Sequence, residues 1–117
     1  MALSKENIIN LEDFRVKRSP SEYSKVFTGR DRGVYVRTAS KIDELECQYD
    51  NIIIVIPSDI RSINPSFFEE LFKNVVTKLG KEAFLAKFEF RSEGTYNVNK
   101  PLIEAIQRIL RKDTAIG

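Results

Sequence analysis

The sequence predicts a small α/β domain, and two patterns along the chain lead to that prediction. Ile52–Ile56 is a run of five β-branched residues, which is typical of a strand in the centre of a sheet with both faces covered. Apolar residues at helical spacing follow it as far as Gly80. Because strand–helix–strand order favours parallel pairing, we expect a mixed sheet of about four or five strands with about three main helices.

The chain has the size and composition of one globular domain. It has 117 residues, of which 42% are apolar and 31% are charged, too apolar for a disordered chain. We expect residues 1–24 to add strands and a loop to this domain, and residues 25–112 to form its core. Residues 113–117 are expected to fray.

The first half of the chain predicts short strands and then one long helix. Weak alternation over residues 7–16 and over Tyr23–Phe27 favours short strands, with a turn at residues 18–21 between them. A helix is expected over Gly29–Cys47. Its core face is expected to hold Tyr35, Ala39, Ile42 and Leu45.

The start of this helix carries a capping pattern and two glycines. Thr28 and Asp31 have the spacing of a capping box. Gly29 is expected to allow a tight helix start, and Gly33 to allow close packing against another helix.

The helix after the central strand has two possible starts. Asn64 followed by Pro65 fits an N-cap and a first helical residue, whereas Ser66 with Glu69 fits a capping box. In either case the apolar stripe predicts a helix that runs to Leu79.

The remaining segments predict one more strand and one more helix. Alternation of Phe84, Ala86, Phe88 and Phe90 with polar residues favours a strand over Glu82–Arg91. A last helix is expected over Asn99–Lys112, and residues 58–63 are expected to be a loop.

The absence of histidine and the single cysteine, Cys47, exclude several kinds of chemistry. Ser-His and Cys-His catalytic pairs, His-ligated metals and an internal disulfide all need residues that this sequence lacks. We therefore expect no catalytic residue, no metal site and no cofactor.

The sequence also predicts where the protein works. The first residues lack the apolar segment of a signal peptide, and the longest apolar run, Ile52–Pro57, is far shorter than the ~20 residues of a membrane helix. A free cysteine without a targeting segment points to the cytoplasm, and no membrane partner is expected.

Charge is unevenly distributed although the net charge is only +2. Residues 15–37 hold seven basic and two acidic side chains, a local charge of +5. This stretch is either a solvated surface or a patch that faces an anion, with Arg30, Arg32 and Arg37 as the candidate ligands. The acidic pairs Asp43–Glu44 and Glu69–Glu70 are expected on solvated helix faces.

The segment Pro57–Ser66 joins the central strand to its helix and is the candidate site. Ligands of α/β sheets tend to bind at the carboxyl ends of strands, beside helix N-termini. The segment offers Arg61, Ser62, Asn64 and Ser66 as polar groups. It is interpreted either as plain helix capping or as a phosphorylation or partner-binding site. Asp59 is the single acid there, and no base partner accompanies it.

Residues 52–72, IIIVIPSDIRSINPSFFEELF, resemble the STAS-like domain family of unknown function, bacterial relatives of the anti-sigma factor antagonists. Residues 27–33 with Arg37 look like the start of that family's first helix, and Leu79–Gly80 and the segment Ala83–Phe90 follow in the expected order. The resemblance covers roughly residues 25–112. It implies a STAS-type fold and a binding role rather than an enzymatic one.

The resemblance also implies a mode of regulation. In the antagonist relatives, a Ser or Thr at the start of the matching helix is phosphorylated by a kinase-like ATPase, and the phosphate breaks the complex. This sequence departs from the relatives' Asp-Ser-Ser-Gly turn, because Pro65 stands where the modified hydroxyl would be. Ser66 is then the first candidate for phosphorylation and Ser62 the second.

Together these patterns predict a non-enzymatic regulatory module that binds a protein partner, a kinase-like ATPase or another regulator. Arg61, Ser62, Asn64 and Ser66 would form its docking surface. The alternative is a nucleic-acid or anion-binding module that uses the basic stretch Arg15–Arg37. The sequence leaves the oligomeric state open.

Overall fold

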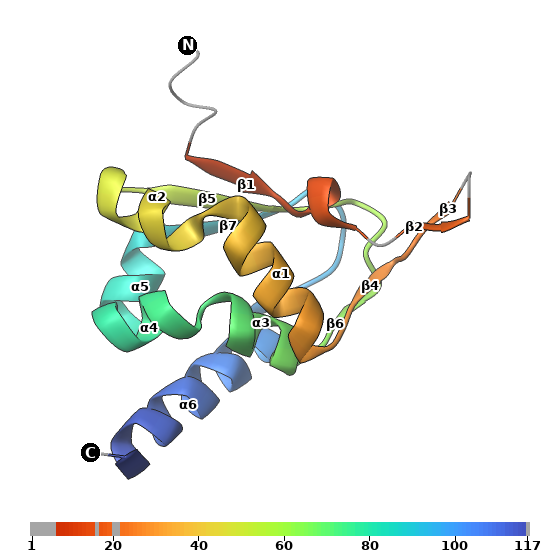
Figure 1. Cartoon of the computed structure of the whole chain (residues 1–117). Coiled ribbons are helices and arrows are strands. Elements are labelled where there is room, and N and C mark those ends of the chain that lie inside the picture. The colour runs from red at the N-terminus through yellow and green to blue at the C-terminus, as the bar shows by residue number, and fades with distance from the viewer. Residues whose placement is uncertain (1–6, 16, 20–21, 117) are drawn as a thin grey trace.

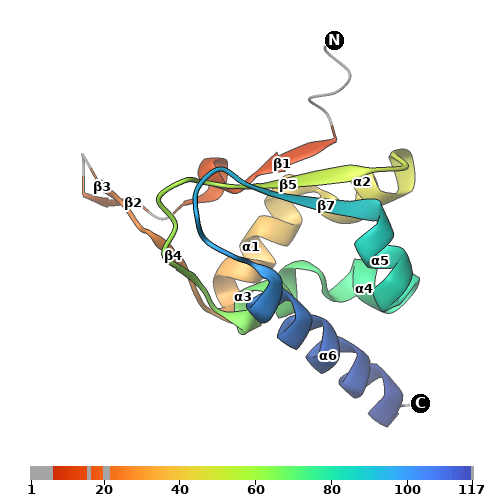
Figure 2. The same cartoon turned by 180° about the vertical axis from the view of Figure 1, so that it is seen from behind.

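The computed structural model describes residues 7–15, 17–19 and 22–116, and Figures 1 and 2 show their arrangement from opposite sides. Predictions that fall on residues 1–6, 16, 20–21 and 117 lie outside these residues. The strands are β1 (Ile8–Asn10), β2 (Lys17–Ser19), β3 (Glu22–Tyr23), β4 (Val26–Phe27), β5 (Ile52–Ile56), β6 (Ser62–Ile63) and β7 (Phe88–Ser92). The helices are η2 (Leu11–Phe14, a 3-10 turn), α1 (Arg30–Ser40), α2 (Ile42–Gln48), α3 (Pro65–Leu71), α4 (Lys73–Leu79), α5 (Lys81–Lys87) and α6 (Asn99–Ile116).

The strands form one three-stranded sheet and two separate ribbons. The sheet has the order β1-β5-β7 and is entirely parallel, so the expected α/β class and the central place of Ile52–Ile56 are confirmed. β2 pairs with β3 in an antiparallel ribbon, and β4 pairs with β6 in a parallel one. The expected mixed sheet of four or five strands is therefore wrong, because the short strands pair with each other instead of extending the sheet.

The segment predicted as a strand over Glu82–Arg91 begins as a helix. α5 occupies Lys81–Lys87, and β7 begins only at Phe88. Phe84 and Phe88 are four residues apart, which fits one face of a strand and also one face of a helix. Their rings stack with centroids 4.6 Å apart. Alanine, leucine and lysine are compatible with a helix before Phe88, and the packing of Phe84 against Phe72 and Phe88 settles the choice.

Both long predicted helices are broken. Lys41 adopts a left-handed conformation with φ of 58°, which separates α1 from α2. Phe72 leaves helical geometry with φ of −100° and ψ of 7°, which separates α3 from α4. The break at Phe72 places this fully buried ring against Phe84 and Phe88. Six α-helices of the described chain thus replace the three that were expected.

The face that α1 buries also differs from the predicted one. Tyr35 is 53% exposed, while Gly33 and Val36 are buried. Gly29 is the N-cap residue with φ of 88°, which confirms the tight helix start, and no side chain caps the helix, so the capping box of Thr28 is wrong.

The helices lie on one side of the three-stranded sheet and enclose the core (Figures 1 and 2). The core is rich in aromatic rings, with Phe27, Phe67, Phe68, Phe72 and Phe84 fully buried. α6 packs against α3 and α4 and continues four residues beyond the predicted end at Lys112. None of the helices in the described chain is long and apolar enough to cross a membrane.

The contact between α1 and α3 depends on Gly33, as the sequence predicts. A Cβ atom at Gly33 would lie 2.5 Å from the Phe67 carbonyl oxygen and 2.8 Å from the Glu70 Cβ. The backbone of α3 therefore comes too close to α1 for any side chain at this position.

We expect Gly33→Ala to lower the free energy of unfolding by about 1–3 kcal/mol, because the added methyl group pushes α1 away from α3. Urea unfolding measures the change, with Val34→Ala on the exposed face of α1 as the control. A gain of about 1 kcal/mol, as alanine gives in an unobstructed helix, would contradict this close packing.

Candidate functional site

Backbone hydrogen bonds hold the segment between β5 and α3 in place. The N–H of Arg61 donates to the Lys25 carbonyl oxygen and the N–H of Asn64 to that of Phe27, both at 2.8 Å. On the other side, the N–H of Ile63 donates to the Tyr96 Oη at 3.0 Å. The expected loop over residues 58–63 is therefore in part a strand, β6, and its position is well defined.

Asn64 caps α3, and Pro65 is its first residue. The Asn64 Oδ1 accepts hydrogen bonds from the Ser66 N–H at 2.9 Å and from the Ser66 Oγ at 2.7 Å. This decides between the two predicted starts, since Asn64 is the N-cap, the Ser66 hydroxyl donates a hydrogen bond to it, and Glu69 is buried.

An exposed surface surrounds this helix start. Val26 on β4 is 38% exposed and lies in register with the exposed Ser62 on β6. Arg61 and Asn64 are also exposed, whereas Ser66 is half-buried. The four predicted residues thus lie together, next to an apolar side chain that sequence reasoning missed. The α3-entry surface is defined here by Val26, Arg61, Ser62, Asn64 and Ser66.

Asp59 lies near this surface and is anchored by Arg15. The Arg15 Nη1 and Nη2 donate to the two carboxylate oxygens of Asp59 at 2.8 and 2.9 Å, and its Nε donates to the Ser24 carbonyl oxygen. These bonds hold the pKa of Asp59 below its ordinary value. The pair spans 44 positions of the chain, so no local pattern could have indicated it.

Two of the three arginines proposed for anion binding already contact carboxylates. Arg30 lies 3.4 Å from Glu69 and 3.2 Å from Glu70, and these contacts raise its pKa. The Arg37 Nη1 lies 3.7 Å from the Glu70 Oε1 and donates to the Glu70 carbonyl oxygen at 2.6 Å. Arg32 stands over the Tyr35 ring, 4.8 Å from its centroid.

The expectation that Glu69 and Glu70 are solvated is wrong. Glu69 is only 2% exposed and Glu70 is half-buried. Helix periodicity alone does not show that arginines of α1 and α6 surround this side of α3, where Arg108 also lies 3.8 Å from Glu69. A buried carboxylate is tolerated there because cations face it.

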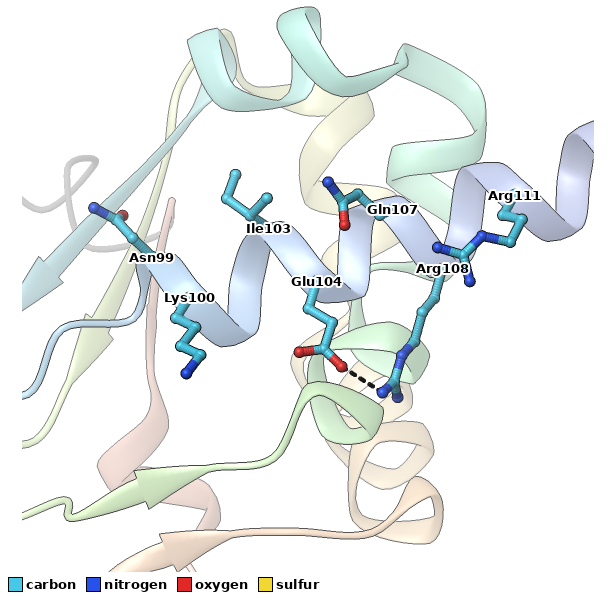
Figure 3. A pocket seen from close by; sticks show the side chains of 7 residues that line it. All are labelled: Asn99, Lys100, Ile103, Glu104, Gln107, Arg108 and Arg111. Carbon is cyan, nitrogen blue, oxygen red and sulfur yellow. Dashed lines mark hydrogen bonds and ion pairs between the residues drawn. The ribbon is translucent and has the colours of Figure 1, made fainter.

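A shallow hollow follows the outer side of α6 (Figure 3). Ile103 is its apolar residue, and the Arg108 guanidinium donates to Glu104 one helical turn away. The full lining is Asn99, Lys100, Ile103, Glu104, Gln107, Arg108 and Arg111. Because Arg108 is shared between Glu104 and Glu69, this hollow borders the ion pairs that join α6 to α3.

Across the described ranges, no group of three or more histidine, cysteine, aspartate or glutamate side chains gathers closely enough to hold a metal ion. The structure defines the molecule as an α/β domain in which backbone hydrogen bonds hold the exposed α3-entry surface in place. No family model, curated protein or solved structure matches the chain.

We expect Asp59→Asn to lower the free energy of unfolding at neutral pH and to leave it nearly unchanged at low pH. The pKa of Asp59 is lower in the folded state than its ordinary value of about 3.9, so the pair stabilises the fold above about pH 4. This contribution is lost as the pH falls through the lowered pKa. Urea unfolding of both proteins at pH 7 and at low pH measures it, with Asp50→Asn as an exposed control. An equal difference at both pH values would contradict the pairing.

Proposed function

We propose that this protein is a non-enzymatic regulatory module of the STAS-like type that binds a protein partner through the α3-entry surface. The observation that carries the proposal is the exposed pair Val26 and Ser62, which lie in register on a backbone-anchored ribbon. Protein interfaces place apolar contacts inside a polar rim, and Val26 among its polar neighbours has that arrangement on a small scale. Because hydrogen bonds to Lys25, Phe27 and Tyr96 hold this ribbon, binding would order little additional chain.

The state of Asp59 supports binding rather than catalysis. A general acid needs a pKa near the working pH, whereas the Arg15 guanidinium lowers the pKa of Asp59 and keeps it ionised. Both carboxylate oxygens accept bonds from Arg15, so the group positions the segment before β6 instead of facing a substrate. The proposed partner is a kinase-like ATPase or another regulator in the cytoplasm, as the STAS-like resemblance implies.

Between the two candidate hydroxyls, the geometry favours Ser62 as the phosphate acceptor. Ser62 is exposed on β6, while Ser66 is half-buried and its Oγ donates to Asn64 at 2.7 Å. A kinase would have to break that bond before Ser66 could react. A phosphate on Ser62 would place about two negative charges beside Val26, which would oppose an apolar contact there.

The nucleic-acid alternative has less support, because three of its cations already have partners within the chain. Arg15, Arg30 and Arg37 bind carboxylates or a carbonyl oxygen within the chain. Phosphate contacts at these residues would first have to displace internal partners.

Charge substitutions on the α3-entry surface test the proposal. We expect wild-type protein to retain a partner from its native cytoplasmic extract after nuclease treatment. Val26→Glu and Arg61→Glu are expected to lower the retained amount about tenfold, because each removes a contact at the centre of the surface. Val34→Glu, on the exposed face of α1, is the matched control and should retain the partner.

Equal retention by all four proteins would contradict the proposed surface. Loss of the retained material on nuclease treatment would instead favour nucleic acid and the basic stretch.

Phosphate mimicry at the two serines tests the regulation. We expect Ser62→Asp to weaken the captured partner's affinity about tenfold and Ser62→Ala to leave it nearly unchanged. Titration calorimetry with the purified partner measures both values. Ser66→Asp and Ser66→Ala provide the comparison, and a loss confined to Ser66→Asp would move the switch to that residue.

A further inference from the structure

The three-stranded sheet ends in an open edge at β7. β7 is the last strand in the order β1-β5-β7, and no other described strand pairs with its outer side (Figure 2). Its five residues, Phe88–Ser92, pair with β5 in an unbroken register and include no proline. Proteins commonly protect such edges with proline, bulges or lysine, because an exposed edge can pair with another strand.

The hydrogen-bond pattern shows which backbone groups this edge offers. The Glu93 N–H donates to the Ile56 carbonyl oxygen at 2.9 Å, and backbone groups of a strand alternate between its two sides. Glu89 and Arg91 therefore direct their backbone groups toward β5, and Phe90 and Ser92 direct theirs outward. The Phe88 N–H also points away from β5, but it donates to the Phe84 carbonyl oxygen. The free donors of the edge are thus the amides of Phe90 and Ser92.

The charges on this strand are arranged so that they complement a second copy. Glu89 and Arg91 lie on the sheet face away from the helices, with the Arg91 Nη2 2.9 Å from the Glu89 Oε2. In an antiparallel pair centred on Phe90, each Glu89 stands opposite Arg91 of the other copy. Phe90 would meet its own copy in a hydrogen-bonded pair, so the charged residues fall in the closer, non-hydrogen-bonded pairs.

We propose that two copies of this chain associate through their β7 strands, antiparallel about a two-fold axis at Phe90, and form one continuous sheet across the dimer. Phe90 exchanges both backbone hydrogen bonds with Phe90 of the other copy, and the Ser92 amide donates to the Phe88 carbonyl oxygen of the other copy. Glu89 and Arg91 set the register, since a shift by two residues would leave each charge without its opposite partner. The half-buried Phe90 ring stays packed against Phe68 and Phe72, so pairing needs no repacking.

Charge reversal and charge exchange test this dimer. Sedimentation velocity from about 1 μM to about 1 mM should show a reversible monomer–dimer equilibrium, weak because a strand-edge interface is small. Glu89→Arg and Arg91→Glu each place like charges opposite one another, and we expect each to raise the dissociation constant about tenfold. The exchanged double variant should restore the wild-type value, and an equimolar mixture of the two single variants should form heterodimers.

Hydrogen exchange supplies a second readout on the same proteins. Protection of the Phe90 and Ser92 amides should rise with protein concentration, while the Arg91 amide, bonded to β5, should be protected at every concentration. Glu44→Arg, an exposed reversal on α2, is the control and should dimerise like the wild type.

A protein that stays monomeric throughout this range would overturn the proposal. So would a dimer that both single reversals leave unchanged. The proposed partner-binding surface includes no residue of β7, so failure of either proposal leaves the other standing.

Discussion

The close contact between α1 and α3 at Gly33 is the constraint on which much of this structure depends. Because glycine has no Cβ atom, the two helices approach until the backbone of α1 at Gly33 lies against the backbone of α3. This places Phe67 and Phe68 in the core and brings Glu69 and Glu70 under the arginines of α1. The start of α3 is positioned by the same contact, and with it the surface proposed to bind a partner.

Ion pairs between distant segments also hold the fold together. The local charge of +5 over residues 15–37 suggests a basic surface, yet folding turns several of these cations inward or toward acids. Arg15 holds Asp59, and Arg30 lies between Glu69 and Glu70. A carboxylate as buried as Glu69 would be costly without such partners, so these arginines serve the fold. The charge of a segment is therefore a poor guide to the charge of the surface it forms.

Two exposed regions of the fold are proposed to contact other chains. One is the ribbon of β4 and β6, which lies at the side of the body near the starts of α1 and α3 (Figure 1) and exposes Val26 beside Ser62. The other is the outer edge of β7, where backbone groups of Phe90 and Ser92 have no strand beside them in the described chain. The two lie on different elements, so contact with a partner and contact with a second copy are separate properties of one scaffold.

The sequence by itself determined the features whose causes are local. The β-branched run Ile52–Ile56 predicts the central strand, and Asn64 before Pro65 predicts the start of α3, because propensity and capping act within a few residues. Only the tertiary structure decided that Glu82–Lys87 is helical, since Phe84 and Phe88 satisfy both periods. It also decided that Glu69 is buried, because the arginines that neutralise it come from helices distant in the chain.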